Sequence, residues 1–440
     1  MRNIRQSVRL LILVAVMALI GAACAGDDAT DTTEAATDTT EPATETTAAP
    51  TETTAAPTET TEAASDEPIR IGMLTDLSAT PPAAPFTPWA VQVRDGMLLA
   101  AEEINADGGI DGQMIEIVEQ DSENDQDAGV AGFERLVEDG VVAVGGIISS
   151  TVGAAVSPLA EELQMPTFLV KSGTEAALTA DSRFMFRTCL PAAPMDAAPV
   201  LQYAQEQGLS NVGVIVADYA WGQAFAGAVE AAFEGSEVDY GEIQVAPVPP
   251  DTDFTPFVRN MADAGAQMVI ATGHPPGNAA ILALSADLIG DVPVTGAWVP
   301  PDLAVGPQPD VAIGRYADFA CADYTSESYA ALAERYFASS DNTFMSDDAV
   351  AGHGIVTMVA QAVGEVGNDP AAIAEYMHQN SFDLDGYAHP LSWTEWGELA
   401  EAQPIFFRIT EGPAPEGLNE AGEWWLEVLT QSEPLEPYQP

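Results

Sequence analysis

Basic residues are scarce in this chain of 440 residues, which carries 13 Lys and Arg against 68 Asp and Glu, a formal net charge of −55. Lysine occurs once, at Lys171. Nucleic acid and anionic lipid are bound through clusters of Lys and Arg, so the composition argues against both as electrostatic partners. A saline habitat that screens self-repulsion, or the general composition of the lineage, would account for the acidity.

Motifs for catalysis and metal binding are also missing. There is no His-Glu-x-x-His or Cys-x-x-Cys spacing, no Gly-x-Ser-x-Gly nucleophile elbow and no Walker loop. The acidic run Asp121, Glu123, Asp125, Asp127 lacks the glycine and the final glutamate of a calcium loop, so we expect a solvated turn there. We therefore expect no catalytic residue, no metal and no cofactor.

A long apolar run is found only near the N-terminus. Arg2, Arg5 and Arg9 precede the 11 apolar residues 10–20, fewer than the roughly 20 of a membrane-spanning helix, and small residues lead to Cys24. This is the layout of a secretory signal peptide. The end of the segment, Gly-Ala-Ala-Cys, resembles a bacterial lipobox, although Gly21 stands where the lipobox usually has Leu. We predict a signal peptide at 1–24 with a lipidated Cys24; ordinary cleavage after Ala-Cys-Ala is the alternative.

Residues 25–66 contain no Lys, Arg or aromatic residue, and the heptapeptide Thr-Glu-Thr-Thr-Ala-Ala-Pro occurs at 44–50 and again at 51–57. Such a segment buries too little apolar surface to offset its ordering entropy. We predict a disordered tether that joins an exported body, residues 67–440, to the lipid anchor. Since no later segment is apolar for long enough to span a membrane, we expect membrane contact through the lipid alone.

The body alternates between strand-like and helical patterns, which favours βαβ units in parallel sheets. The alternation runs once up to residue 170 and starts again at residue 212, so we expect an α/β fold of two lobes. The expected strands are 69–74, 114–118, 141–148, 167–170, 212–217, 268–271, 294–299, 404–409 and 424–429. The expected helices lie around 93–104, 154–163, 222–233, 278–288 and 346–366.

Several blocks resemble the branched-chain amino-acid (leucine/isoleucine/valine-binding) group of ABC transporter substrate-binding proteins, which have the type I periplasmic binding protein fold. The most specific is Glu-Ile-Asn-x-x-Gly-Gly-Ile-x-Gly at 103–112. The other matching blocks lie at 69–78, 144–151, 186–188 and 218–222, with an acidic strand exit at Asp121.

This resemblance implies two Rossmann-like lobes joined by three crossovers, with lobe 1 at 67–189 plus 323–403 and lobe 2 at 190–322 plus 404–440. It implies a cleft at the carboxyl ends of the strands that closes over a solute by hinge motion. We expect an extracytoplasmic protein that captures a small polar metabolite, an amino acid, an amide or a small carboxylate, and delivers it to an ABC permease. A ligand-sensing receptor subunit of the same fold and a secreted α/β hydrolase are the alternatives.

In the first lobe, the hydroxyls of Ser149, Ser150 and Thr151 follow a strand and precede a helix, where they and the free N–H groups could bind a ligand carboxylate. A plain helix cap is the alternative. In the resembling family, the next loop holds the amino and carboxylate groups, which implies that Ser172 and Thr174 bind the ligand. Ser172 with Glu175 also has the spacing of a capping box.

In the second lobe, Tyr219 and Trp221 match positions at which the family presents aromatic rings to the cleft, with core packing as the alternative. His274 matches another contact position, or is a plain loop residue. Trp298 stands where amino-acid binders of the group commonly carry an acidic residue that pairs with the ligand ammonium. An amine could rest on its ring, but the missing carboxylate leaves an amide, a carboxylate or an aromatic compound as further candidates.

Apart from Cys24, the cysteines are Cys189 and Cys321, and both fall at expected crossovers between the lobes. Disulfides persist in the oxidising compartments to which exported proteins go. We hypothesise a disulfide between them; two buried, inert cysteines are the alternative.

Overall fold

A computed structural model describes residues 67–80, 86–248, 252–272, 277–296, 298–306, 308–418 and 423–440. All of these residues belong to one compact unit, Glu62–Pro440. The predicted signal peptide, Cys24, the tether and His274 lie outside the described residues.

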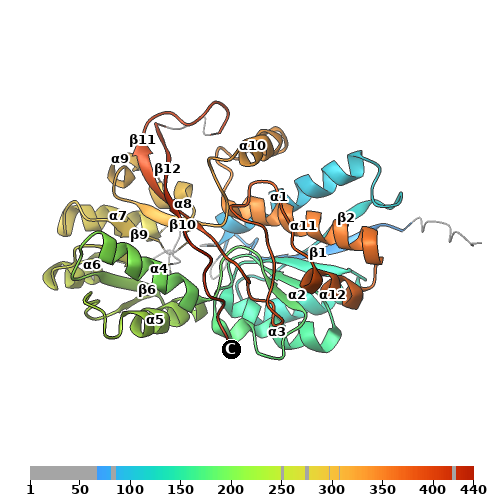
Figure 1. Ribbon diagram of the computed structural model, residues 1–440, viewed down its shortest axis with the longest axis horizontal. Helices are drawn as coiled ribbons and strands as arrows, with labels where there is room; N and C mark the ends of the chain where they lie inside the picture. Colours follow the sequence, from blue (N-terminus) through green and yellow to red (C-terminus); the bar gives the residue numbers. More distant parts are fainter. Residues whose placement is uncertain are drawn as a thin grey trace, which may run out of the picture. The chain divides into compact units, whose positions relative to one another are not determined.

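The first sheet has five parallel strands in the order β2-β1-β3-β4-β5. Every residue of β3 is buried, as expected for a strand that is covered on both faces. Since β1 lies between β2 and β3, the connections leave to opposite sides at this point, and ligands bind at such a switch point in open α/β sheets. The strands are β1 (Ile69–Thr75), β2 (Ile115–Asp121), β3 (Ala143–Ile147), β4 (Thr167–Leu169) and β5 (Met185–Arg187). The helices α1 (Thr87–Ala106), α2 (Gln126–Glu138) and α3 (Ser150–Leu163) connect them (Figure 1).

The second sheet has four parallel strands in the order β7-β6-β8-β9, the same pattern of reversal as in the first. Its strands are β6 (Gly213–Ala217), β7 (Gln244–Ala246), β8 (Val269–Ala271) and β9 (Val294–Thr295). Its helices are α4 (Ala193–Glu206), α5 (Ala220–Phe233), α6 (Thr255–Asp263) and α7 (Gly277–Leu288), followed by α8 (Pro301–Val305) and α9 (Pro309–Ala312). The prediction of an α/β fold with two lobes is confirmed.

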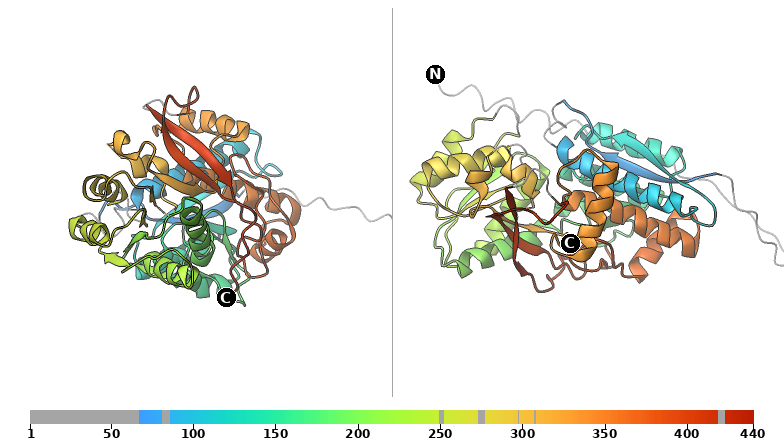
Figure 2. Two further views of the ribbon diagram at one scale, coloured as in Figure 1. Left: turned by 60° about the vertical axis from the view of Figure 1, so that its left-hand side comes forward. Right: turned by 90° about the horizontal axis from the view of Figure 1, so that it is seen from above.

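The last third of the chain forms a third sheet and three more helices. An antiparallel sheet is formed by β10 (Ala317–Ala320), β11 (Ile405–Glu411) and β12 (Trp424–Gln431), and its long ribbon is visible in Figures 1 and 2. Three helices precede this ribbon: α10 (Glu327–Ser339), α11 (Asp347–Val366) and α12 (Pro370–Gln379).

Helix α11 packs closely against α1 because both helices carry glycine at the crossing. A Cβ atom at Gly96 would lie 2.1 Å from the carbonyl oxygen of Ala349, and one at Gly352 would lie 2.1 Å from that of Val93. We expected no later segment to be apolar for long enough to span a membrane. This was wrong, since α11 is long and apolar enough by length and composition alone. However, 67% of its apolar stretch is buried inside the protein, as expected of a core helix.

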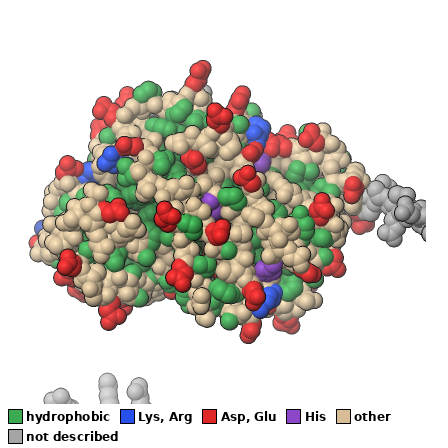
Figure 3. Space-filling model, viewed as in Figure 1, with side chains coloured by type: hydrophobic (Ala, Val, Ile, Leu, Met, Phe, Trp, Pro, Cys, Tyr) green, Lys and Arg blue, Asp and Glu red, His purple; other side chains and the backbone are tan. Residues whose placement is uncertain are grey.

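Acidic side chains are spread over the face shown in Figure 3, with few basic ones among them. The acidic run at 121–127 is a turn with structural contacts. Asp125 caps α2 by accepting hydrogen bonds from the backbone N–H groups of Asp127 and Ala128, and Asp121 accepts one from that of Leu77.

Candidate functional site

The loop between β3 and α3 carries the first predicted hydroxyls. Ser149 caps α3, because its Oγ accepts a hydrogen bond from the Val152 N–H at 3.4 Å, and it also donates to Asn124 Oδ1 at 2.5 Å. Helix α3 starts at Ser150, earlier than the expected residue 154. Ser150 is 1% exposed, and its Oγ has no hydrogen-bond partner among the described residues, whereas Thr151 is half-buried.

The loop after β4 carries Ser172 and Thr174. Ser172 is fully buried and packs against the first turn of α3: its Oγ would lie 2.2 Å from a Cβ atom at Gly153. This Oγ has no hydrogen-bond partner in the described chain. The predicted capping box of Ser172 and Glu175 is wrong. Thr174 is the cap, and it accepts from the Ala176 N–H at 3.4 Å at the start of a single 3₁₀ turn, Glu175–Ala177.

Arg187, at the end of β5, positions this loop. Its guanidinium donates hydrogen bonds to the carbonyl oxygens of Ser172 and Thr174, the latter at 2.7 Å. Its Nε donates to Glu398 Oε2 at 2.9 Å, and both side chains are fully buried. Burial raises the pKa of Glu398 although the charge of Arg187 opposes the shift. Sequence reasoning noted the Phe-Arg-Thr block but gave Arg187 no role.

Lys171, two residues after the end of β4, was also missed. Its Nζ lies 2.8 Å from Asp347 Oδ2 and 4.0 Å from Asp348 Oδ1, and the residue is 5% exposed. Burial acts to lower the pKa of Lys171, but the neighbouring carboxyl groups, Asp347 foremost, outweigh it and raise the pKa, so the ammonium group stays charged. The signal in the sequence was the chain's single lysine at the end of an apolar strand.

Trp298 reaches the same point from the second sheet. The centroid of its ring lies 5.3 Å from Lys171 Nζ, and its Nε1 donates to Asp196 Oδ1 at 2.6 Å. The expected strand at 294–299 ends at Thr295, and Trp298 has a φ of 77°, a left-handed backbone that is strained for a bulky residue.

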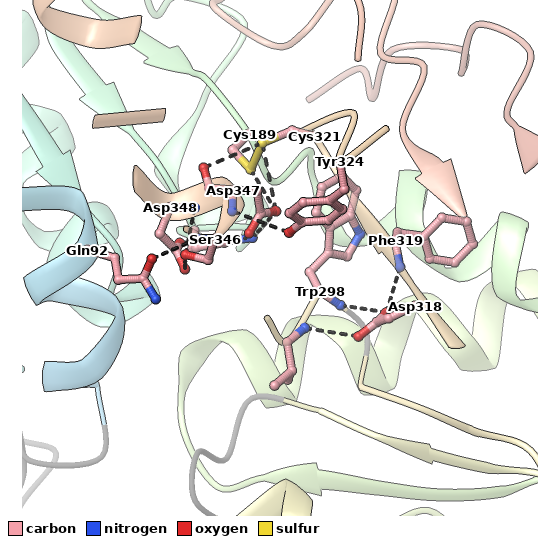
Figure 4. A network of polar contacts seen from close by, with 12 residues as sticks. Gln92, Cys189, Trp298, Asp318, Phe319, Cys321, Tyr324, Ser346, Asp347 and Asp348 are labelled. Carbon is pink, nitrogen blue, oxygen red and sulfur yellow. Dashed lines mark hydrogen bonds and ion pairs between the residues drawn. A yellow bond between two sulfur atoms is a disulfide. The ribbon is translucent and has the colours of Figure 1, made fainter. Parts of the chain in front are cut away.

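Asp318 on β10 holds this strained backbone in place. Its carboxylate accepts hydrogen bonds from the backbone N–H groups of Trp298 and Val299, each at 3.0 Å (Figure 4). Four further donors complete its coordination: Thr295 Oγ1, the N–H of Gly296, the N–H of Phe319 and the hydroxyl of Tyr316. No local pattern indicates this arrangement, because Asp318 follows Trp298 by 20 residues and belongs to another sheet.

Three further buried carboxyl groups lie beside these residues: Asp348 and Asp302 interact with Asp347, and Asp196 bonds Trp298. Burial raises the pKa of Asp348 to about 8 and that of Asp302 to about 7, and it raises the pKa of Asp196 well above its usual value. Each has one oxygen that no described residue hydrogen-bonds: Asp348 Oδ1, Asp302 Oδ1 and Asp196 Oδ2. With a pKa of about 8, Asp348 holds a proton at neutral pH and can donate a hydrogen bond.

Tyr219 and Trp221 contact residues that follow strands of the first sheet. Tyr219 is half-buried, and its ring centroid lies 5.4 Å from that of Phe86. Trp221 is 3% exposed, and its ring would come within 2.2 Å of a Cβ atom at Gly173, so only glycine leaves room for the indole. The structure thus brings Ser172, Trp221 and Trp298 to the boundary between the two sheets.

Cys189 and Cys321 form a disulfide between segments 132 residues apart, and both are buried. Asp347 Oδ2 lies 3.4 Å from Cys189 Sγ and 3.8 Å from Cys321 Sγ (Figure 4). These contacts are not hydrogen bonds, since bonded sulfur carries no proton. For the same reason these three residues, which lie close enough to hold a metal, offer no thiolate ligand.

Comparison with known proteins identifies the family. Residues 68–412 match the model of the periplasmic binding protein family. A leucine/isoleucine/valine-binding protein homologue of Brucella melitensis is 30% identical over 213 residues, which are 47% of this chain and 54% of the relative, so the chain aligns with about half of that relative's length.

Two solved structures share the fold. One is a leucine-, isoleucine-, valine-, threonine- and alanine-binding protein from Brucella ovis in its closed conformation, with a TM-score of 0.72, 16% identity, and coverage of 85% of this chain and 98% of that one. The other is an ABC transporter solute-binding protein from R. palustris in complex with benzoate, with a TM-score of 0.70, 17% identity, and coverage of 84% and 98%. The expectation of a binding protein and not an enzyme is confirmed, and the chain belongs to the periplasmic binding protein family.

Proposed function

We propose that this protein is the extracytoplasmic solute-binding subunit of an ABC transporter, whose two lobes close over a small polar metabolite and present it to a membrane permease. The supporting observation is the contact of Lys171, from the first sheet, with Trp298, from the second, among buried polar atoms that have no partner in the described chain. Buried polar groups are normally hydrogen-bonded, so several unpartnered ones at one place indicate a site for a ligand.

In this proposal the first lobe binds the polar end of the solute. Ser150 and Thr151 start α3, where free N–H groups and the helix dipole favour an acceptor group, and Ser172 and Thr174 lie on the neighbouring loop. Ser149 acts as the cap that orients these residues.

The second lobe covers the apolar part of the solute. Tyr219, Trp221 and Trp298 supply rigid aromatic surface at little cost in conformational entropy. His274, outside the described residues, remains a predicted ligand contact.

The proposal includes the chain's organisation. Lobe 1 comprises 67–189 plus 323–403, and lobe 2 comprises 190–322 plus 404–440. The disulfide then joins two of the three crossovers. Residues 1–24 are a signal peptide, Cys24 carries the lipid, and 25–66 tether the body to the outer face of the cytoplasmic membrane.

A thermal-shift screen tests this function. A solute that binds only the folded protein at 100 times its dissociation constant adds about 2.7 kcal/mol to the free energy of unfolding. Amino acids, amides, small carboxylates and aromatic acids form the screen. We expect at least one class to raise the melting temperature, and a screen without any shift would contradict the proposal.

Two variants then locate the site. Ser150→Ala and Trp221→Ala are each expected to reduce the shift given by the best solute. The matched controls are Ser339→Ala, at the end of α10, and Trp396→Ala, whose indole hydrogen-bonds the Tyr438 carbonyl. Unchanged melting-temperature shifts in both site variants would contradict the assignment of Ser150 and Trp221 to the ligand-binding cleft.

A further inference from the structure

The groups around Lys171 are those that hold an ammonium ion. Its Nζ lies 5.3 Å from the centroid of the Trp298 ring, 2.8 Å from Asp347 Oδ2 and 4.0 Å from Asp348 Oδ1. An aromatic face within about 6 Å attracts a cation, and a charged hydrogen bond to a carboxylate adds to this attraction. The protein's own side chain therefore fills an ammonium site at the boundary between the two sheets.

Most of the polar groups that remain around this site can donate hydrogen bonds, and Asp347 Oδ1, which has no described partner, is the exception. The Lys171 ammonium has three N–H groups, and one of them is bonded to Asp347. The hydroxyls of Ser150 and Ser172 have no partner among the residues that the structure describes. Burial raises the pKa of Asp348 to about 8, so this carboxyl group can also donate at neutral pH. Such donors need an acceptor, which a carboxylate or amide oxygen supplies and an ammonium group does not.

Charge repulsion acts in the same direction. A ligand ammonium group near Trp298 would have to displace Lys171 or lie beside it. Two like charges about 4 Å apart repel each other enough, at the effective dielectric constants of protein sites, to weaken binding roughly tenfold or more.

We infer that Lys171 acts as a built-in ammonium group, and that the cleft selects small carboxylic acids and amides that carry no ammonium group of their own. This inference rests on the proposed function and makes Lys171 a specificity-determining residue of the same site. Monocarboxylates with an aromatic or branched aliphatic body satisfy both the donors around Lys171 and the ring of Trp221.

Matched pairs of ligands test the selectivity of the wild-type protein. Leucine and 4-methylpentanoate share a skeleton and differ in the α-ammonium group, and phenylalanine and 3-phenylpropanoate form a second pair. By calorimetry and thermal shift we expect each deaminated acid to bind at least tenfold more tightly than its amino acid. Tighter or equal binding of the amino acids would overturn the inference and leave the proposed function intact.

Lys171→Ala tests the ammonium site without knowledge of the ligand. This variant leaves the Asp347 carboxylate without its counter-charge and the Trp298 ring without its cation, so n-butylammonium is expected to raise its melting temperature more than butan-1-ol at the same concentration and ionic strength. Lys171→Met, which fills the space without a charge, and the wild-type protein are the controls, and neither is expected to respond. Equal effects of the ammonium ion and the alcohol on Lys171→Ala would overturn the inference.

A measurement on the wild-type protein covers the case in which Lys171→Ala does not fold. Because Lys171 is the single lysine, protein labelled with ¹³C-lysine reports on this side chain alone. Packing on the indole is expected to shift its ε-methylene proton signals upfield, and a signal at the free-lysine position would overturn the inference. Butylammonium rescue without any solute-induced shift would instead count against the proposed function alone.

Discussion

Arg187 and Lys171 are both buried cations beside a carboxylate, but the regions around them differ. All three guanidinium nitrogens of Arg187 donate hydrogen bonds, to Glu398 and to two carbonyl oxygens of the loop after β4. Around Lys171, in contrast, Asp347 Oδ1, Asp348 Oδ1 and Ser172 Oγ have no hydrogen-bond partner within the described ranges.

This difference separates a structural region from a binding region. A buried polar network with every group bonded stabilises one conformation, whereas unbonded buried groups cost free energy unless something else satisfies them. The Arg187 region fixes the loop that carries Ser172, and the Lys171 region presents groups that a solute can satisfy. The two are joined by a short stretch of chain, since Cys189 follows Arg187 by two residues and its sulfur contacts Asp347.

The largest effect is expected when the structural region is broken. Arg187→Met leaves Glu398 buried without its counter-charge, and such a loss costs about 3–5 kcal/mol of the free energy of unfolding. Urea unfolding followed by circular dichroism measures it. The double variant Arg187→Met/Glu398→Leu is expected to lose less than the single one, because it leaves no unpaired charge. A single variant that loses under about 1 kcal/mol would contradict the structural role of Arg187.

Removal of the disulfide tests the link between the two regions. Cys189→Ser/Cys321→Ser is expected to lower the free energy of unfolding by about 2–4 kcal/mol, because the bond closes a loop of 132 residues and so restricts the unfolded chain. Reduction of the wild-type protein should cause a similar loss. Peptide mapping after alkylation of the native, unreduced protein provides the control: modification of Cys189 and Cys321 would show that the bond is not formed in solution.

Sequence patterns predicted the structural features that depend on local burial. The alternation of apolar strands and helices gave both parallel sheets, because a strand covered on both faces reads as a continuous apolar run. The predicted strand at 294–299 failed at its end because Asp318, on another strand, holds Trp298 in a left-handed backbone. Local propensity contains no information about such a distant acceptor.

Sequence patterns predicted the hydroxyl residues of the candidate site but not its charged and aromatic pairs. Ser150 and Ser172 were predicted because each follows an apolar strand pattern within a few residues, and such a pattern can be recognised locally in the sequence. The partner of Lys171 lies 176 residues later, and Asp196 and Trp298 are 102 residues apart, so no spacing in the sequence indicated these pairs. The same distance in sequence hid the role of Arg187, whose partner Glu398 follows by 211 residues.

The carboxyl group of Asp348, in the Lys171 region, is expected to make the stability of the protein depend on pH. The pKa of Asp348 is about 8 when folded, whereas an unfolded aspartate titrates near 4, so the folded protein binds this proton more tightly. Between these values the free energy of unfolding falls as pH rises, by roughly 1.4 kcal/mol from pH 6 to pH 7. Asp348→Asn should remove this part of the decline.

Unfolding curves of both proteins at pH 6, 7 and 8 give the measurement. The charged and titratable groups that face Asp348 are Lys171, Asp347 and Asp302, and they remain in both proteins. The pKa of Asp302, about 7, adds a decline of the same sign to each curve, so the difference between the curves isolates Asp348. Parallel curves would show that Asp348 does not hold a proton in the folded protein.

The smallest effects on the free energy of unfolding are expected at two adjacent hydroxyl residues, Ser149 and Ser150. Ser149→Ala removes the cap of α3 and is expected to cost about 1 kcal/mol of the free energy of unfolding, because the Val152 N–H loses its acceptor. Ser150→Ala removes a buried hydroxyl that no described residue bonds, so the free energy of unfolding should stay within about 0.5 kcal/mol or rise. Solute affinity should respond in the opposite order, with the larger loss in Ser150→Ala. A loss of stability in Ser150→Ala equal to that in Ser149→Ala would mean that both hydroxyls serve the scaffold, and the distinction between satisfied and unsatisfied buried groups would then fail at this loop.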